Sequence, residues 1–254
     1  LDRPNPINGT TVEGKSLQLE FRSFIGRHEV PMRHGLTLGE FALMHQRYWT
    51  KDSCQLKVIT MQNWDRSMYF DNTGLPWALP SPNIARPATT LTFPAIVLFE
   101  GTELSEGRGT VQALEIFGHP KLDPFGWMKR SLQDKIKRSG LQGFALRPIH
   151  FKPTFDKHMN TPCGGLQLHI TDRSLFQPWR VGLFLLREVY HELKDDFSWR
   201  QPPFEYNEEQ LPIDLLNGCF ELREWVVGQG DMEQLNTLED HAEFAQQRRK
   251  ILLY

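Results

Sequence analysis

Residues 93–110 read FPAIVLFEGTELSEGRGT, and the predicted fold is built around this segment. The first seven residues are apolar, include Val and Ile, and follow a segment rich in Pro, Ser and Asn, so we expect a buried strand over Phe93–Phe99. The polar, glycine-rich residues that follow would then lie at the carboxyl end of that strand, where open α/β sheets usually bind ligands.

The polar part of this stretch, residues 100–110, is the first candidate site. It interleaves three carboxylates, one guanidinium and three hydroxyls with three glycines, which allow tight turns and a close approach of the backbone to a ligand. It contains neither the Gly-Lys-Ser/Thr ending of a phosphate-binding loop nor a GxGxxG fingerprint, so a nucleotide is not indicated. The alternative is a solvated loop in which Arg108 pairs with a glutamate.

Periodicity and turn residues predict the rest of the fold. Thr37 and Glu40 have the spacing of a capping box in front of an amphipathic helix. The expected helices cover residues 38–49, 126–138, 178–193 and about 231–253, the last with Leu235, Leu238, Ala242 and Phe244 facing inward. The expected strands cover residues 56–61, 93–99, 144–151 and 166–171, and residues 1–9 form a loop. We therefore predict an α/β or α+β fold with a mixed sheet flanked by helices.

Composition excludes several classes of protein. The 254 residues carry a formal charge of -2, and no run of Lys or Arg is long enough to follow a phosphate backbone, so we expect no nucleic-acid partner. The densest basic cluster, Arg248-Arg249-Lys250, is expected in the last turns of the terminal helix, where cations complement the helix dipole. No apolar stretch approaches the roughly 20 residues that span a bilayer, so we expect no membrane span.

Cysteine and histidine spacing predicts no metal ion and no cofactor. Cys54, Cys163 and Cys219 lie far apart and in no CxxC pair, which indicates neither a zinc site nor a disulfide framework. His169 and His241 have no partner at the spacing of an HExxH motif.

Two further segments carry side chains that suit an acidic saccharide. Trp64 and Arg66 lie close together in sequence, and Trp77 and Asn83 follow them. Aromatic rings stack on sugar faces, while Arg and Asn bind carboxylate, hydroxyl or acetamido groups. The alternative is structural, because an Arg stacked on a buried Trp is a common arrangement. His34, just before the first helix, is either a substrate-binding or proton-carrying group or a packed capping residue.

The chain carries six motifs that resemble, in order and spacing, the NamZ-type exo-β-N-acetylmuramidases, a family long known only as a domain of unknown function. The motifs are LDRPNP at 1–6, VPMRHGLTLGE at 30–40, WDRSM at 64–68, WALPSPN at 77–83, EGTELSEGRGT at 100–110 and RRKILLY at 248–254. The resemblance implies a glycoside hydrolase that releases terminal N-acetylmuramic acid from the non-reducing end of peptidoglycan fragments. It further implies a role in cell-wall recycling and a location outside the cytoplasm, periplasmic or secreted.

The resemblance also implies that the chain is part of a larger enzyme. Family members of usual length carry a Rossmann-like lobe with a PEHG motif before the DRPNP segment, and their active site lies between two lobes. No PEHG occurs here, so we expect this chain to be the carboxy-terminal lobe, with the amino-terminal lobe as its absent partner. Residues 1–120 would carry most motifs of the cleft, and residues 121–254 the scaffold of helices and strands.

The resemblance assigns roles residue by residue. Glu100 matches the family loop and is the candidate general acid, whereas Glu103 stands where Asn is expected. Glycosidic cleavage usually needs such an acid together with a second group, which is either another carboxylate or the acetamido group of the substrate. A basic side chain would bind the lactyl carboxylate. The predicted substrate-binding residues are His34, Trp64, Arg66, Asn83, Thr102, Ser105 and Arg108, with Arg108, Arg66 or His34 at the carboxylate.

Two other functions compete with this hypothesis. A saccharide-binding module without catalysis would keep the aromatic and Arg side chains but lack its partner lobe. An unrelated metabolic α/β enzyme that uses a nucleotide or a metal is disfavoured by the missing phosphate loop and metal-ligand spacing.

Overall fold

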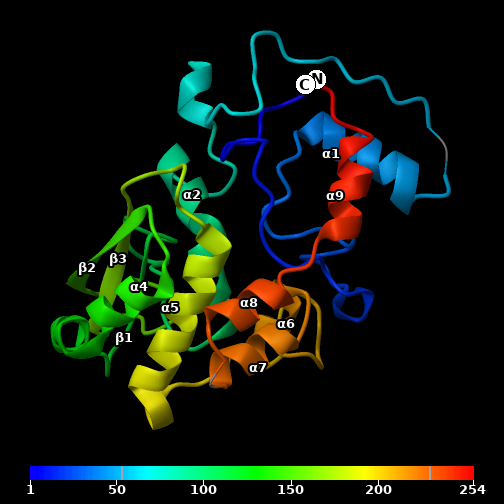
Figure 1. Cartoon of the computed structure of the whole chain (residues 1–254). Helices are drawn as coiled ribbons and strands as arrows, with labels where there is room; N and C mark the ends of the chain where they lie inside the picture. The colour runs from blue at the N-terminus through cyan, green and yellow to red at the C-terminus, as the bar shows by residue number, and fades with distance from the viewer. Residues whose placement is uncertain (53, 229) are drawn as a thin grey trace.

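The computed structural model describes residues 1–52, 54–228 and 230–254, and it contains a three-stranded sheet packed among helices (Figure 1). The strands β1 (Ile116–His119), β2 (Phe144–Phe151) and β3 (Cys163–Ile170) are ordered β1-β3-β2, with β3 antiparallel to both neighbours. The helix-flanked α/β arrangement is confirmed, but the expectation of a mixed sheet is wrong. Only the short segment 152–162 joins β2 to β3, and such a connection favours an antiparallel pair.

The strand expected over Phe93–Phe99 is wrong. These residues belong to α2 (Pro87–Ile96) and the 3-10 turn η4 (Val97–Gly101). The helix begins with Pro87 in its first turn, where the missing N–H costs nothing. The segment is buried almost throughout, and a run of residues without a polar face looks the same in a buried helix as in a buried strand. The sequence therefore predicts the burial of this segment correctly and its secondary structure wrongly.

The main core lies between α2 and α5 (Pro178–Leu193), the helix whose bounds the sequence predicts. Gly182 of α5 meets Ala95 of α2, and a Cβ atom on Gly182 would lie 2.6 Å from both the Cα and the carbonyl oxygen of Ala95. Glycine is needed here because the two helices touch backbone to backbone. α5 also packs against α7 (Glu221–Val227), and α6 (Pro212–Asn217) packs against η4.

A second, smaller core joins the beginning of the chain to its end. α1 (Leu38–Met44) continues into the π-helical turn η2 (His45–Trp49) and packs with α9 (Ala242–Arg249) around Leu36, Met44, Phe244 and Ile251. Figure 1 shows α1 beside α9, with the two termini close together. The capping box of Thr37 and Glu40 is confirmed. Asp2 accepts hydrogen bonds from Thr37 Oγ1 at 2.8 Å and Tyr254 Oη at 2.8 Å, which ties both termini to α1.

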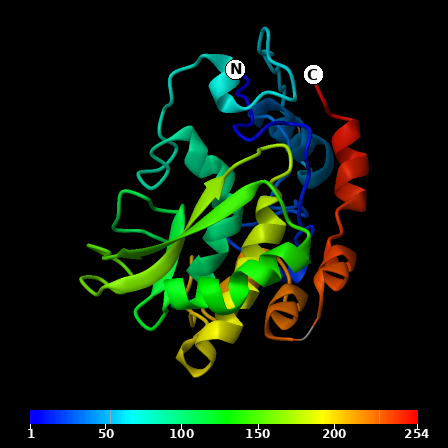
Figure 2. The same cartoon turned by 60° about the vertical axis from the view of Figure 1, so that its left-hand side comes forward.

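Shorter elements complete the described chain. They are η1 (Leu19–Phe21), η3 (Phe70–Thr73), α3 (Pro124–Trp127), η5 (Met128–Leu132), α4 (Gln133–Ser139), η6 (Lys194–Asp196) and α8 (Met232–Leu238). The helix predicted over 126–138 corresponds to α3, η5 and α4, which Figure 2 shows from the side, next to the strands. Among the described helices, none combines the length and the apolar composition that crossing a bilayer requires.

Two other expectations are wrong. Residues 56–61 form no strand, because no neighbouring strand pairs with this apolar run. Leu56 and Ile59 are 37% and 46% exposed. The terminal helix is split into α8 and α9. Glu239, at the break, accepts hydrogen bonds from the amide of Gly14 and from Arg180, and these contacts replace helix continuation. Leu235 and Phe244 are buried as expected, but Ala242 is exposed.

Candidate functional site

The loop after η4 is shaped by its own hydroxyls and glycines. Thr102 Oγ1 donates to the carbonyl of Phe99 at 2.8 Å and accepts from the amide of Leu104 at 3.0 Å. Ser105 Oγ accepts from a backbone amide two residues later at 3.2 Å. Gly109 has a φ of +78°, and a Cβ atom there would lie 2.7 Å from backbone atoms of Phe155. Thr102 and Ser105 are buried, so their visible role is to set the loop's conformation.

Arg108 stands between two glutamates of this loop. One terminal nitrogen pairs with Glu100, and Nε pairs with Oε1 of Glu106 at 2.9 Å. Asp156, from the segment between β2 and β3, lies 4.0 Å from the same Nε atom. The Arg–Glu pair that the sequence left as an alternative is therefore present, and it involves two carboxylates.

Lys157 contacts the loop from its buried side. Its Nζ atom donates to Oε2 of Glu106, to the carbonyl of Phe99 and to the carbonyl of Leu104, each at 2.9 Å. The side chains of Lys157 and Glu106 are only 9% and 2% exposed, so this is a buried ion pair with satisfied hydrogen bonds. It holds the start of the loop to its middle.

The carboxyl of Glu100 is largely shielded from solvent. Its side chain is 15% exposed. Burial raises the pKa of Glu100 above its ordinary value, and the nearby Glu106 adds to the rise, whereas Arg108 and Lys157 act in the opposite direction. A raised pKa favours the protonated form that a general acid must supply, and the paired Arg108 stabilises the carboxylate that remains after proton transfer.

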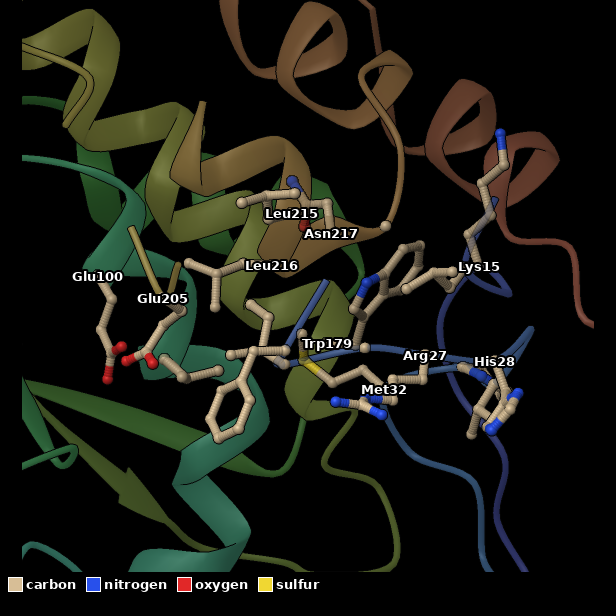
Figure 3. Close-up of a pocket in the computed structure, with 18 of the residues that line it drawn as sticks. Lys15, Arg27, His28, Met32, Glu100, Trp179, Glu205, Leu215, Leu216 and Asn217 are labelled. Atoms are coloured by element: carbon tan, nitrogen blue, oxygen red, sulfur yellow. The ribbon is translucent and has the colours of Figure 1, made fainter. Parts of the chain in front are cut away.

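Glu100 and Arg108 open onto a groove of about 760 Å³, which we call the groove from here on. Its walls come from residues 15–32, from α2 and η4, from the start of α5 and from the end of α6. Figure 3 shows Glu100 and Glu205 at one end of the groove and Lys15, Arg27 and His28 at the other. Between them the lining is largely apolar, with Met32, Phe93, Val97 and Leu216.

The wall formed by residues 15–32 is anchored by a buried ion pair at its two flanks. Arg33 Nη1 pairs with Glu13 Oε1 at 2.5 Å, and both side chains are less than 5% exposed. The other oxygen of Glu13 accepts from the amide of Trp179, in the first turn of α5, at 3.2 Å. A carboxylate at a helix N-terminus is favourable, so this residue joins the wall to α5.

The second set of predicted residues lies in a different cluster. Arg66 makes a two-point ion pair with Glu40, at 2.6 and 2.9 Å, and donates to the carbonyls of Gly9 and Gly35. Trp64 is 9% exposed and packs against Arg66 and edge-on against Tyr254. Neither side chain lines the groove. Their contacts match the structural alternative, and a role in substrate binding stays a prediction.

Arg248, expected to complement a helix dipole, is buried in this same cluster. It donates to the carbonyls of Gly9 and Gly35, the two oxygens that Arg66 also contacts. Burial lowers the pKa of Arg248, and the adjacent Arg66 lowers it further. The dipole interpretation is therefore incomplete for this residue, since its guanidinium points inward to bind backbone carbonyls.

His34 and Asn83 lie apart from the Glu100 loop. His34 Nδ1 accepts from the amide of Leu36 at 3.0 Å, and burial together with Arg248 lowers the pKa of His34 to about 4. The imidazole is therefore neutral at pH 7. Asn83 lies in the turn before α2, where its backbone N–H donates to Ser81 Oγ at 3.3 Å. Neither residue lines the groove, and their predicted roles remain untested.

The structure adds groove residues that the sequence did not indicate. Arg27 and Glu205 occur in no motif. Asn217 lies at the end of α6 and is 5% exposed, and its side-chain oxygen and nitrogen make no hydrogen bond within the described part of the chain. Glu106 does not line the groove, but it lies in the first candidate loop, where it was not assigned a role. Its place beside Arg108 could have been inferred from the loop, whereas the three groove residues come together only through folding of distant segments.

Two family models cover nearly the whole chain. Residues 1–88 match the N-terminal model of exo-β-N-acetylmuramidase NamZ, and residues 91–254 match the C-terminal model. The two matches meet at the start of α2. The expected division near residue 120 stays a prediction.

Known relatives agree with these matches. The peptidoglycan β-N-acetylmuramidase NamZ of Bacillus subtilis (strain 168) is 39% identical over 199 residues, which is 78% of this chain and 47% of that protein. Two crystal structures of DUF1343 family proteins from Bacteroides fragilis NCTC 9343, each 27% identical, superpose with TM-scores of 0.86 and 0.71. Both alignments cover 100% of this chain and 65% of the other. The chain therefore spans about half the length of the Bacillus relative.

Proposed function

The chain belongs to the NamZ family of exo-β-N-acetylmuramidases, and we propose that its groove binds the terminal N-acetylmuramic acid of peptidoglycan fragments as part of a glycoside hydrolase. One observation carries this proposal. The partly buried Glu100 carboxyl, paired with Arg108, opens onto a groove of about 760 Å³ that is apolar in the middle and charged at both ends. A concave, mainly apolar pocket with a few polar groups is typical of a small-molecule site.

The lining of the groove suits a sugar ring. Phe93 and Met32 offer apolar surface for the C–H face of a pyranose. Asn217 lies on the wall with an amide that makes no hydrogen bond among the described residues, and an acetamido or hydroxyl group is a suitable partner for it. These two features together would fix the orientation of a bound N-acetylhexosamine.

Glu100 is the proposed general acid. In its protonated form it would give its proton to the glycosidic oxygen as the bond from that oxygen to the anomeric carbon breaks. Water then adds its oxygen to the anomeric carbon, and the proton that it releases restores the acid. The second group is either another carboxylate or the substrate's acetamido group. Arg108 holds the Glu100 side chain in place and stabilises its ionised form after proton transfer.

We propose that the second wall of the active site comes from the part of the NamZ relatives that this chain does not cover. Hydrolysis needs precise positioning and exclusion of water as well as an acid. The 254-residue chain alone is therefore expected to turn over little substrate. Cell-wall recycling outside the cytoplasm, periplasmic or secreted, is the setting that such an activity implies.

The test compares two loop glutamates in a protein extended to the length of the Bacillus relative. With a chromogenic β-N-acetylmuramide, Glu100→Gln should lower turnover by at least about 100-fold, since general acid catalysis contributes that much. Glu103→Gln is the matched control and should have a mild effect. The reverse ranking would remove Glu100 from the mechanism. Saccharide binding without turnover in the unmodified extended protein would favour a non-catalytic binding module instead.

A further inference from the structure

The two ends of the groove differ in the charge that they can offer to a ligand. Glu100 and Glu205 lie at one end, and Lys15, Arg27 and His28 lie at the other (Figure 3). A ligand with one carboxylate should place it at the end with uncompensated positive charge, because like charges repel strongly where water is partly excluded.

Arg108, at the acidic end, has no uncompensated charge to offer. Glu100 and Glu106 both pair with its guanidinium, and Asp156 lies within 4.0 Å. The ammonium group of Lys157 is paired with Glu106. An incoming carboxylate would have to displace Glu100 from Arg108 and would still face Glu106.

Arg27, at the basic end, is in a different situation. No carboxylate in residues 1–52, 54–228 and 230–254 lies within 4.0 Å of its guanidinium, whereas Lys15 already pairs with Glu221 at 2.8 Å. Figure 3 shows the Arg27 side chain beside Met32, where the basic end of the groove meets its apolar middle. The cation is therefore positioned beside the surface that would hold the sugar ring.

The surroundings of Arg27 add to the positive potential. A smaller adjoining pocket is lined by Arg22, Ser23, Arg27, His28 and His45. The ring of His28 stacks on Trp49 with centroids 4.3 Å apart and planes within 4°. Burial lowers the pKa of His28, and its neighbours His45, Arg22 and Arg27 lower it further. An anion at this end would meet two guanidinium groups.

We propose that Arg27, rather than Arg108, recognises the lactyl carboxylate of N-acetylmuramic acid and so determines the preference for muramic acid over N-acetylglucosamine. This inference rests on the proposed function and deepens it. The planar fork of Arg binds a carboxylate at two points, which a neutral sugar cannot match. The sugar would then lie along the groove with its carboxylate near Arg27 and its glycosidic bond toward Glu100.

The test measures binding and needs no turnover. The 254-residue chain is titrated by calorimetry with N-acetylmuramic acid, with its neutral methyl ester and with N-acetylglucosamine. Arg27→Gln should reduce the preference for the acid over the ester by about tenfold or more, the scale of a charge-assisted contact, and should leave the affinity for the ester unchanged. Arg27→Lys should keep part of the preference. Arg138→Gln, an exposed arginine on α4 outside the groove, is the control and should change nothing.

The outcomes separate the two proposals. A preference that survives Arg27→Gln but is lost in Arg108→Lys overturns the assignment, and so does a wild-type chain without any preference for the acid. Loss of the preference in Arg27→Gln alone supports it. In the extended protein, Arg27→Gln should lower kcat/KM for the muramide. An unchanged kcat/KM contradicts this inference and leaves the hydrolase proposal intact.

Discussion

The Nε atom of Arg108 donates to Oε1 of Glu106 over 2.9 Å, so the guanidinium that faces Glu100 is held from behind by a second carboxylate. That carboxylate is 2% exposed and is held in turn by Lys157. Arg108 thus acts as a link between the groove and the buried part of the loop, and its orientation depends on Glu106.

Glu106→Gln should strongly destabilise the protein. The amide keeps the shape of the side chain but leaves the buried Lys157 ammonium without its carboxylate, and such a loss costs about 3–5 kcal/mol. Urea unfolding followed by tryptophan fluorescence measures this. Asp134→Asn, which removes the exposed pair with Lys137, is the matched control and should cost less than about 1 kcal/mol. Equal costs for the two changes would mean that the buried pair does not stabilise the loop.

Arg248 and Arg249 are adjacent arginines with opposite environments. Arg248 is 9% exposed and binds the carbonyls of Gly9 and Gly35, while Arg249 is exposed. Arg248→Ala should lower the free energy of unfolding by about 1–3 kcal/mol, because it removes charge-assisted hydrogen bonds from the second core. Arg249→Ala should stay within about 0.5 kcal/mol of wild type. The ranking is checked by thermal unfolding, and a larger effect at Arg249 would contradict the described packing.

The pH dependence of stability should contain a contribution from His34. Its pKa is lowered from 6.5 to about 4 in the folded chain by burial and by Arg248, so the folded state binds fewer protons than the unfolded state between these values. The corresponding stability is present above pH 6.5 and is lost as the pH falls toward 4. His34→Asn, which keeps an acceptor for the amide of Leu36, should flatten unfolding free energy against pH in this window. An unchanged slope would show that His34 is accessible to protons in the folded state.

A substitution at Asn217 should weaken ligand binding without lowering the stability of the protein. Its buried amide makes no hydrogen bond with the described residues, so Asn217→Leu removes an unsatisfied polar group of similar size. Leaving such a group unpaired costs about 1–3 kcal/mol, so the variant should be at least as stable as wild type. Its affinity for N-acetylmuramic acid should fall. Calorimetry and thermal unfolding check the two parts, and a destabilised variant with intact binding would make Asn217 purely structural.

The sequence predicted the fold best for elements whose conformation depends on residues close to each other in the chain. The capping box of Thr37 and Glu40 and the apolar face of α5 are of this kind, and both elements occur as expected. The run Phe93–Phe99 failed because its burial on all sides erased the periodicity that distinguishes a helix from a strand. The run at 56–61 failed because strand formation requires a partner, and none pairs with it among the described residues.

The candidate site was predictable only in part, for a similar reason. The loop with Glu100 and Arg108 was visible because its glycines and charges are consecutive in sequence. Trp64 and Arg66 have a composition that suits a sugar, but their contacts with Glu40 and Tyr254 depend on residues far away in the chain. Arg27 belongs to no motif, and only the folded groove brings it opposite Glu100.

We propose that N-acetylmuramic acid binds in the groove between Glu100 and Arg27. A ¹H–¹⁵N NMR titration of the 254-residue chain with this sugar locates the binding site. We predict saturable shifts at the indole N–H of Trp179, the side-chain amide of Asn217 and the guanidinium Nε–H of Arg27, with little change at Trp64. Saturable shifts at Trp64 and around Asn83, with none at the groove residues, would show that the sugar binds outside the groove.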